Sequence, residues 1–499
     1  MSETWDVIVV GSGNAGFSAA QSAFQTGARV LLLEKAPRKW AGGNSYFTAG
    51  AVRTSHGGLE DLEPILERPL DERIGRTCLP AYPDSDFLTD LRRVTRDRTD
   101  PELAQLLVSE SRQTMTWLHG VGLRFGLMFH RQAYEVDGQF RFWGGLALGV
   151  VGGGKGLITQ HIAAAEANGI EVRYSSPVTG LITDGRGAIG GVQVTDDKGQ
   201  YEIVANSVIL TCGGFEANAQ MRASYLGAGW DLAVVRGTPY NTGDGLNLAI
   251  AFGAQPYGHW SGCHSVAWDA KAPLTGDLEL TNQFTRGGYP FGIVVNVEGN
   301  RFVDEGADFR NYTYAKYGAD ILRQTGGIAI QIFDAKVDPL LRSEEYRAPS
   351  VTKVEADTLS GLAQKLGIDV TQFLRTVEEF NSAVIGSPFN PTIKDGSATR
   401  GITPPKSNWS QRLDTPPFVA FPVTCGITFT FGGLRTDTDG RVLDTASRVI
   451  KGLYAAGEMM GGLFYFNYPG GSGLTAGSVF GRRAGAAAVT DFAKHESHS

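Results

Sequence analysis

The chain opens on a short apolar strand that leads directly into a glycine-rich turn. Residues 5–10 (WDVIVV) are followed by the motif Gly11 to Gly16 (GSGNAG). In a turn of this kind the first glycine makes the bend, the second lets the backbone approach a phosphate, and the third lets the following helix pack on the strand. The next apolar strand, residues 29–33, ends in Glu34, where a carboxylate accepts hydrogen bonds from a ribose. The pattern predicts a βαβ unit that binds a dinucleotide, with an ordinary βα turn as the alternative.

Length and composition restrict the classes of protein that fit. With 499 residues the chain is too long for one hydrophobic core, so two domains or one elaborated domain are expected. Its 66 glycines are about 13% of the residues against a usual ~7%, and their clustering indicates close backbone approaches to a ligand. The net charge of −7 and the pI of about 5.7 give no electrostatic case for a nucleic-acid partner.

The cysteines bear on metal binding, and the apolar runs and the N-terminus bear on cellular location. Cys78, Cys212, Cys263 and Cys425 lie far apart and form no CxxC pair, which argues against an iron–sulfur cluster, a structural zinc or a disulfide framework. We therefore expect no metal site. No apolar run reaches the length of a transmembrane helix, and the N-terminus lacks the basic region of a signal peptide. These features predict a cytoplasmic protein without a membrane span.

The order of apolar and polar segments predicts a largely parallel sheet with an inserted β meander. The expected elements are a helix over 101–118 capped by Thr99 or Asp100, a helix over 158–167, and strands over 171–174, 180–183, 191–195 and 207–210. Between residues 255 and 414 aromatic and polar residues become more frequent, and the segment ends in a proline-rich stretch. This change predicts a second domain inserted into the first.

A second glycine-led unit near the C-terminus favours FAD over NAD. The segment Ala455 to Glu458 ends a strand, and Ser472-Gly473 opens an Ala/Gly-rich helix. FAD needs one binding segment for its ADP half and another for the ribityl chain and ring. A nicotinamide dehydrogenase needs only the first of these segments. The helix that begins near Ser472 is expected to aim its N–H groups at the flavin pyrimidine.

The predicted fold is therefore of the α/β class. We expect a doubly wound, Rossmann-like FAD-binding domain made of residues 1–254 and 415–499. An α+β capping domain of residues 255–414, which contacts the substrate, is inserted into it.

The motifs together resemble the flavoprotein subunits of fumarate reductase and succinate dehydrogenase, a family that includes 3-ketosteroid dehydrogenases. The resemblance covers nearly the whole chain, and its markers are Gly11 to Gly16, Glu34, Gly42 to Ser45, Cys212 to Gly214, Asn241 to Gly245, Arg301 to Glu305, Ala455 to Glu458 and Phe480 to Arg482. Within the family, residues 301–318 and 466–475 are most similar to the FAD-dependent tricarballylate dehydrogenases.

The glycine motifs and the resemblance define a predicted FAD site. Its members are Gly11, Gly13, Asn14, Ala15, Gly16, Glu34, Lys35, Gly42, Gly43, Asn44, Ser45, Val178, Gly213, Gly214, Asn241, Gly243, Asp244, Gly457, Glu458, Ser472, Gly473 and Leu474. Membrane-bound relatives carry covalent FAD on a histidine in the region that here reads Asn44 to Phe47. Because that region contains no histidine, we expect non-covalent FAD. The scattered cysteines mean that any iron–sulfur electron acceptor is a separate protein.

The resemblance implies an enzyme, an FAD-dependent dehydrogenase that acts on the CH–CH group of its donor. In the desaturating direction a base takes the α-proton beside a carbonyl or carboxylate while hydride passes to the flavin. Arg310 is the first candidate for proton transfer, since an arginine shortly after the motif Arg301 to Glu305 serves there in soluble fumarate reductases. A bidentate clamp on a substrate carboxylate is the alternative role for Arg310. Tyr312 and Tyr314 are alternative bases.

Other positions bear on substrate choice. His264 falls where the family has a substrate-binding histidine, and we expect it to bind a carboxylate and to carry charge near neutral pH; a structural histidine is the alternative. Thr281 and Arg286 resemble a threonine and the arginine that follows it in the family. The number of residues between the two differs here, so their roles stay open. A second substrate histidine is replaced within Thr428 to Phe431, and Tyr468 replaces a carboxylate-binding arginine.

Tyr468 resembles a tyrosine of the ketosteroid dehydrogenases. In those enzymes the tyrosine hydroxyl and a backbone N–H polarise the ketone of the substrate. A packed tyrosine is the alternative. The leading hypothesis is desaturation or reduction beside a carboxylate or carbonyl, with a tricarballylate-like acid as substrate. A ketone desaturase of 3-ketosteroid or polyketide type is second, favoured by Tyr468, Trp143, Trp260 and Phe429. A flavin-binding redox partner without its own substrate is third.

Overall fold

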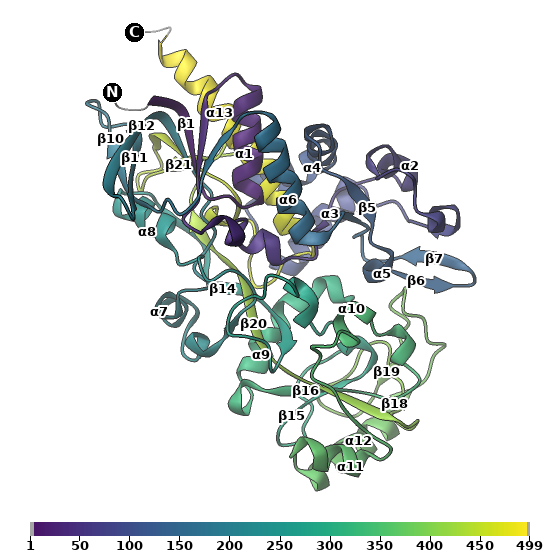
Figure 1. Ribbon diagram of the computed structural model, residues 1–499. Coiled ribbons are helices and arrows are strands. Elements are labelled where there is room, and N and C mark those ends of the chain that lie inside the picture. Colours follow the sequence, from purple (N-terminus) through teal and green to yellow (C-terminus); the bar gives the residue numbers. More distant parts are fainter. Residues whose placement is uncertain (1–3, 497–499) are drawn as a thin grey trace.

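The computed structural model describes residues 4–496, which form two lobes (Figure 1). The first lobe is built on a mixed eight-stranded sheet. Its strands are β10 (Val178–Thr183), β11 (Ile189–Asp196), β12 (Gly199–Leu210), β1 (Thr4–Val10), β2 (Val30–Leu33), β9 (Glu171–Arg173), β22 (Val449–Ala455) and β21 (Arg441–Leu443). β1 pairs in parallel with β2 and β12, while β10, β11 and β12 form an antiparallel meander. The predicted parallel sheet with an inserted meander is confirmed.

Helices cover the sheet because both faces of its central strands are apolar. Val7 and Val9 of β1 face a core shared with α1 (Asn14–Gln25), α3 (Asp84–Thr95), α4 (Pro101–Val121) and α13 (Ser472–Glu496). Ile8 and Val10 face the other way, toward α8 (Asp244–Ala251) and the meander. Asp100 caps α4 by accepting from the backbone N–H groups of Glu102 and Leu103. The predicted helix at 158–167 begins earlier, as α6 (Gly153–Ala167).

The close packing of α13 on α1 explains the Ala/Gly-rich composition of α13. A Cβ on Gly481 would lie 2.5 Å from the Ala15 carbonyl oxygen, and one on Gly485 would lie 2.2 Å from that of Ala19. Glycine at these positions therefore lets two helix backbones meet. The contact brings the N-termini of α1 and α13 to the same region of the molecule.

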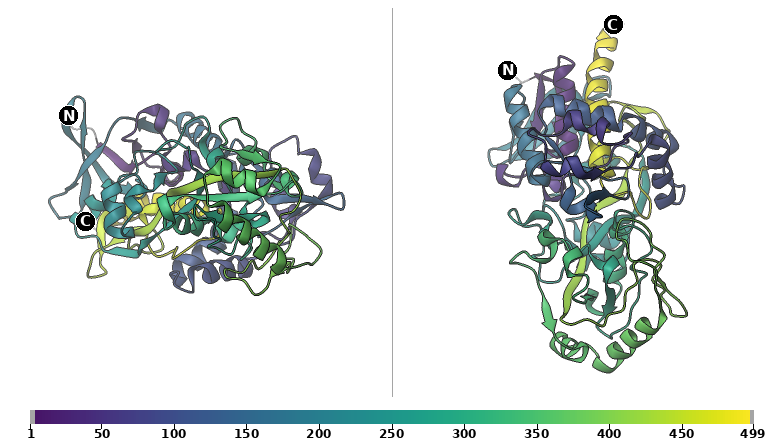
Figure 2. Two further views of the ribbon diagram at one scale, coloured as in Figure 1. Left: turned by 90° about the horizontal axis from the view of Figure 1, so that it is seen from below. Right: turned by 90° about the vertical axis from the view of Figure 1, so that its right-hand side faces the viewer.

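The second lobe is built on a six-stranded sheet. Its strands are β13 (Val234–Val235), β20 (Phe418–Leu434), β16 (Ala329–Phe333), β15 (Ile293–Asn296), β14 (Pro256–Asp269) and β17 (Val354–Ala356). Its helices are α9 (Tyr314–Leu322), α10 (Ser343–Tyr346), α11 (Leu359–Leu366) and α12 (Val370–Ala383), of which α11 and α12 pack on β15, β16 and β20. Figure 2 shows, in its right-hand view, this lobe stacked below the first with α11 and α12 at its far end.

The long antiparallel strands β14 and β20 join the lobes. In Figure 1 they run through the middle of the molecule, and the predicted domain boundaries of 255 and 414, which stay a prediction, lie just before β14 and β20. Small elements complete the fold. They are β3 (Ala51–Val52), β5 (Phe125–Leu127) and β8 (Leu148–Val150) in one sheet, β4 (Thr77–Cys78), β6 (Ala133–Val136) and β7 (Gln139–Phe142) in another, β18 (Val384–Ile385) with β19 (Ala398–Thr399), and helices α2 (Leu59–Leu62), α5 (Phe129–Gln132) and α7 (Ala219–Met221).

Two kinds of feature are absent from residues 4–496. No helix in this range combines the length and apolar character needed to cross a membrane. No group of three or more His, Cys, Asp or Glu side chains in the same range is arranged to hold a metal ion.

Candidate active site

A long cavity connects the glycine turn at the end of β1 with the space between the two lobes. Its empty volume is about 1840 Å³ with the solvent at its mouth included. The residues that line it extend from Gly11 in the first lobe to His264 and Arg310 in the second, the extent expected for an extended cofactor and a small substrate.

The glycine turn forms the first end of the cavity. Gly11 has a φ of +106°, and a Cβ there would lie 2.6 Å from the Thr211 carbonyl oxygen. A Cβ on Gly16 would lie 1.9 Å from the Gly11 carbonyl oxygen. Gly13 is the N-cap of α1 and has no side chain to cap the helix, while the Ser45 hydroxyl accepts from the N–H of Asn14 at 3.1 Å. Glycine is thus required by the bend itself, and the helix N-terminus is left open to an anionic group.

The carboxylate of Glu34 is fixed beside this turn. It accepts from the Ser12 backbone N–H (2.9 Å), the Ser12 hydroxyl (2.7 Å) and the Ala36 N–H (2.7 Å). Next to it, the Lys35 ammonium pairs with Asp244 at 2.5 Å. The cavity is lined by Glu34, Lys35 and Asp244. Positively and negatively charged side chains therefore lie beside the N-terminus of α1.

A second helix N-terminus and a buried carboxyl pair lie further along the cavity. Gly473 and Leu474, in the first turn of α13, line it together with Gly457 and Glu458. Glu458 accepts from the backbone N–H (2.6 Å) and the hydroxyl (2.9 Å) of Thr430. Glu458 follows β22, which pairs with β12, and the chain after β12 carries Glu216.

Glu216 is fully buried, and its carboxyl group lies close to that of Glu458. A Cβ on Gly214 would lie within 3 Å of both carboxyl groups, at 2.2 Å from Glu458 Oε1 and 2.8 Å from Glu216 Oε2. Glu216 Oε1 accepts from Asn241 (2.9 Å) and from Asn44, while its Oε2 has no partner among the described residues. Burial raises the pKa of Glu216 to about 7, and burial and then the charge of Glu216 raise the pKa of Glu458. Because two charges this close in a buried site repel each other, we infer that the pair holds at least one proton near neutral pH.

Two tyrosines meet at the other end of the cavity. The hydroxyls of Tyr314, the first residue of α9, and Tyr468 lie 2.6 Å apart, and both side chains line the cavity. Burial and the adjacent Tyr314 raise the pKa of Tyr468 well above its ordinary value, so Tyr468 stays protonated. The pair can therefore pass a hydrogen bond, and a proton, to a group in the cavity.

His264 lines the cavity beside this pair, with its ring 4.8 Å from that of Tyr314 and 4.9 Å from that of Tyr468. Its Nε2 is buried and has no hydrogen-bond partner within the described residues. Burial, followed by the charge of Arg236, lowers the pKa of His264 well below its ordinary value. The expectation that His264 carries charge near neutral pH is therefore wrong, because a cation there would be desolvated beside another cation.

Buried arginines surround the same end of the cavity. Glu345, which is fully buried, accepts from Arg131 (3.0 Å), Arg310 (3.3 Å) and Arg342 (3.3 Å). Arg131 also pairs with Glu344. Burial lowers the pKa of Arg310, and the charge of Glu345 opposes that effect. Arg131 and Arg310 line the cavity.

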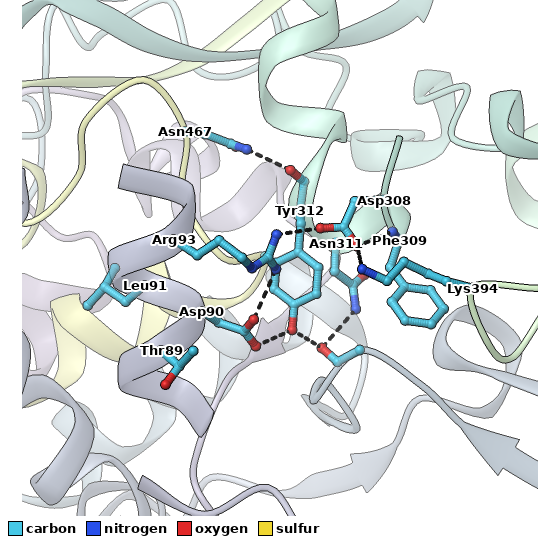
Figure 3. Close-up of polar contacts among 12 residues, drawn as sticks. Thr89, Asp90, Leu91, Arg93, Asp308, Phe309, Asn311, Tyr312, Lys394 and Asn467 are labelled. Carbon is cyan, nitrogen blue, oxygen red and sulfur yellow. Dashed lines mark hydrogen bonds and ion pairs between the residues drawn. The ribbon is translucent and has the colours of Figure 1, made fainter. Parts of the chain in front are cut away.

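Tyr312 does not line the cavity, and Figure 3 shows its hydroxyl directed toward α3. The hydroxyl donates to Asp90 (2.5 Å), on α3, and the backbone carbonyl of Tyr312 accepts from Asn467 (2.6 Å). Arg93, one turn further on α3, pairs with Asp308 at 2.5 Å. Tyr312 therefore ties the segment between Asp308 and α9 to the first lobe, and its hydroxyl is not available to a substrate in the cavity.

The predicted site residues divide into two groups. Those that line the cavity are Gly11, Gly13, Asn14, Ala15, Glu34, Lys35, Gly43, Asn44, Ser45, Val178, Gly213, Asn241, Asp244, Gly457, Glu458, Gly473, Leu474, His264, Arg310 and Tyr468. Gly16, Gly42, Gly214, Gly243 and Ser472 do not line it and instead lie in close packing contacts behind its wall. Of the aromatic residues taken to favour a ketone, Phe429 lines the cavity and Trp143 and Trp260 do not.

Sequence reasoning missed Arg131, Arg236, Asn282 and Thr285 as cavity residues and Glu216 as the partner of Glu458. None of them belongs to a motif with a fixed spacing. The adjacent acids Glu344 and Glu345 are the one sequence signal that could have indicated a cluster of arginines.

The pair that resembles a family threonine and arginine has no place in this cavity. Arg286 is buried in an ion pair with Asp269 at 2.7 Å, and Thr281 does not line the cavity. Arg286 therefore stabilises the second lobe, and neither residue lines this cavity.

The residues of the cavity fit FAD. The open N-terminus of α1 suits the pyrophosphate, and the fixed carboxylate of Glu34 retains acceptor capacity for a ribose. The second binding segment, made by Glu458 and the first turn of α13, lines the same cavity. Fold and site together define a two-lobed, FAD-dependent oxidoreductase.

Comparisons with known proteins agree with this class. The FAD binding domain family matches residues 79–474, and the FAD dependent oxidoreductase family matches residues 6–114. A probable fumarate reductase of Shewanella frigidimarina is 30% identical over 494 residues, which cover 97% of this chain and 74% of that protein. A 4-oxocyclohexanecarboxylate 2-dehydrogenase of Sinomonas cyclohexanicum is 30% identical, covering 98% of this chain and 94% of that protein.

A solved structure, the open conformation of a flavocytochrome c3 fumarate reductase, has a TM-score of 0.73 at 28% identity and covers 98% of this chain and 79% of that chain. The chain belongs to the FAD binding domain family, together with the fumarate reductase flavoproteins. The predicted family, fold class and cofactor are confirmed.

Proposed function

We propose that the protein desaturates, or in the reverse direction reduces, a carbon–carbon bond beside a carboxylate of a small organic acid with several carboxylates, such as tricarballylate. The observation that carries this proposal is the Tyr314–Tyr468 hydroxyl pair in a cavity end surrounded by buried arginines. Bound FAD would supply hydride transfer at this end. No histidine lies in the segment from Asn44 to Phe47, which supports non-covalent attachment.

Arg310 and Arg131 would bind the carboxylate next to the reacting carbon. Each is held toward the cavity by Glu345, and a guanidinium matches a carboxylate with two parallel hydrogen bonds. Negative charge that develops on this carboxylate as the α-proton leaves is stabilised by both cations. We assign binding rather than proton transfer to Arg310, because a guanidinium is not deprotonated in proteins.

Tyr314 would exchange the α-proton with the substrate. As a phenolate it accepts the proton in the desaturating direction, and as a phenol it returns the proton in the reducing direction. The hydroxyl of Tyr468, 2.6 Å away, would donate to the Tyr314 oxygen while that oxygen exchanges the proton. A neutral His264 leaves its orphaned nitrogen to hydrogen-bond the substrate without adding charge.

A ketone substrate is the second candidate. Tyr468 stays protonated and can donate to a carbonyl oxygen. One relative of similar identity is a 4-oxocyclohexanecarboxylate 2-dehydrogenase, whose named substrate carries a ketone as well as a carboxylate. The buried arginines favour the acid, since a neutral steroid would leave them without an anion.

Anaerobic mixing of the oxidised, FAD-loaded protein with candidate substrates separates these functions. We expect tricarballylate to bleach the flavin absorbance and a 3-ketosteroid to leave it unchanged. Bleaching by the steroid alone contradicts the acid proposal. Bleaching by 4-oxocyclohexanecarboxylate and not by tricarballylate supports the ketone function. Failure of a broad panel of acids and ketones favours a redox partner without its own substrate. A separate electron acceptor would be sought by adding artificial dyes to the bleached enzyme.

A further inference from the structure

Arg236 is a buried cation without an anionic partner. It follows β13 directly, its exposed fraction is 6%, and its side chain lines the cavity. The guanidinium donates to the amide oxygen of Asn282, and its carbon lies 5.7 Å from the centroid of the Trp268 ring. Its Nε has no hydrogen-bond partner, and no carboxylate pairs with it among residues 4–496. Burial lowers its pKa, which reports the cost of holding this charge away from water.

The arginine cluster around Glu345 does not neutralise Arg236. Glu344 and Glu345 are the carboxylates paired with Arg131, Arg310 and Arg342 in the described part of the chain, so these arginines already exceed their partners. Arg236 adds a further positive charge to the same cavity end. A buried charge is costly unless it is paired, so the cavity is prepared for an anion.

The position of Arg236 in the same cavity as Tyr314 indicates that the anion belongs to the substrate. Tyr314, Arg131 and Arg236 all line the cavity, and Tyr314 packs against the cluster that contains Trp268, whose ring lies beside the Arg236 guanidinium. Arg131 comes from α5 of the first lobe, whereas Arg236 is held separately by Asn282. A substrate that faces Tyr314 therefore lies in a cavity with two cationic groups held on separate elements.

We propose that Arg236 binds a second carboxylate of the substrate, distinct from the carboxylate held by Arg310 and Arg131. The substrate is then a di- or tricarboxylate whose reacting carbon lies between two carboxylates. The guanidinium group, whose side chain lines the cavity, supplies the donors toward that second group. This inference rests on the proposed function, because it assigns the substrate class of the same cavity.

The test measures binding with acids that have no CH–CH group and so cannot be desaturated. Acetate, malonate and citrate carry one, two and three carboxylates. Each is titrated into the FAD-loaded protein, and the dissociation constant is taken from the change in the flavin absorbance spectrum. In the wild-type protein we expect citrate or malonate to bind about 30-fold or more tightly than acetate.

Arg236→Met should reduce the preference for citrate or malonate over acetate to within a few-fold, because acetate keeps the site at Arg310 and Arg131. Arg236→Lys keeps the positive charge and loses the planar set of guanidinium N–H donors. It should retain part of the preference for citrate or malonate over acetate. Arg323→Met is the matched control. Arg323 lies at the end of α9, its side chain is 72% exposed, and it pairs with Asp320, so its loss should leave the preference unchanged.

Three results overturn the inference. One is a wild-type protein that binds acetate as tightly as the polycarboxylates. Another is an Arg236→Met protein that loses affinity for all three acids by the same factor. The third is an Arg236→Met protein that keeps the preference but shows a changed flavin reduction potential, which would assign Arg236 to the cofactor. Retained FAD absorbance shows that each variant is folded. Because none of the probes is turned over, a preference that depends on Arg236 stands even if tricarballylate fails to bleach the flavin.

Discussion

Replacement of Tyr314 by phenylalanine is expected to slow reduction of the flavin by the acid substrate by about 10²–10⁴-fold, the usual contribution of a positioned acid–base group. The side chain lines the cavity together with the arginines that would hold the substrate, and its hydroxyl contacts Tyr468 at 2.6 Å. Phenylalanine keeps the ring that packs against His264 and removes only the group that exchanges the proton. Rapid anaerobic mixing, monitored by flavin absorbance, measures the rate.

Tyr312→Phe is the matched control, since it makes the same change two positions earlier in the chain. The Tyr312 hydroxyl contacts Asp90, and its loss leaves that buried contact unmade. We expect a loss of about 1–3 kcal/mol in the free energy of unfolding and a rate of flavin reduction close to that of the wild type. A rate that falls in Tyr312→Phe and is retained in Tyr314→Phe would contradict the assignment of proton transfer to Tyr314.

The FAD end of the cavity could be predicted from sequence because backbone geometry dictates its residues. Gly11 needs a positive φ, and Gly16 faces the Gly11 carbonyl oxygen at a distance that excludes a Cβ. Such requirements act within one turn of chain and leave a fixed spacing of glycines. Glu34 follows from the same unit because it comes directly after the adjacent parallel strand.

The reaction end could not be predicted in the same way because small changes in backbone direction decide which side chains reach the cavity. Tyr312 ends a short 3₁₀ turn and Tyr314 begins α9, and Thr313 between them has a non-helical φ of −128°. The two tyrosines therefore face different surroundings, and no periodicity in the sequence distinguishes them. Arg236 and Arg131 come from segments far apart in the chain, so only tertiary structure brings them together.

Replacement of Glu216 by glutamine is expected to raise the free energy of unfolding at pH 8 and to leave it nearly unchanged at pH 5. Burial raises the pKa of Glu216 to about 7 from an ordinary 4.5, so the folded protein binds this proton more tightly than the unfolded chain does. Stability from this group is then fully present below pH 4.5 and is lost as the pH rises through about 7. The loss amounts to about 3 kcal/mol at 1.36 kcal/mol per pKa unit.

Glutamine suits the site because its amide oxygen can still accept from Asn44 and Asn241, while its NH₂ group can donate to Glu458. The measurement is urea unfolding of the wild-type and variant proteins at pH 5 and pH 8 with FAD at one fixed excess concentration. Glu378→Gln, an exposed change on α12, is the control and should keep the pH dependence of the wild type. If Glu216→Gln were no more stable than the wild type at pH 8, the raised pKa of Glu216, and with it the expected loss of stability at high pH, would be contradicted. A variant that is more stable than the wild type at pH 8, and that loses less stability than the wild type between pH 5 and pH 8, would show that Glu216 takes up a proton on folding beside the FAD cavity.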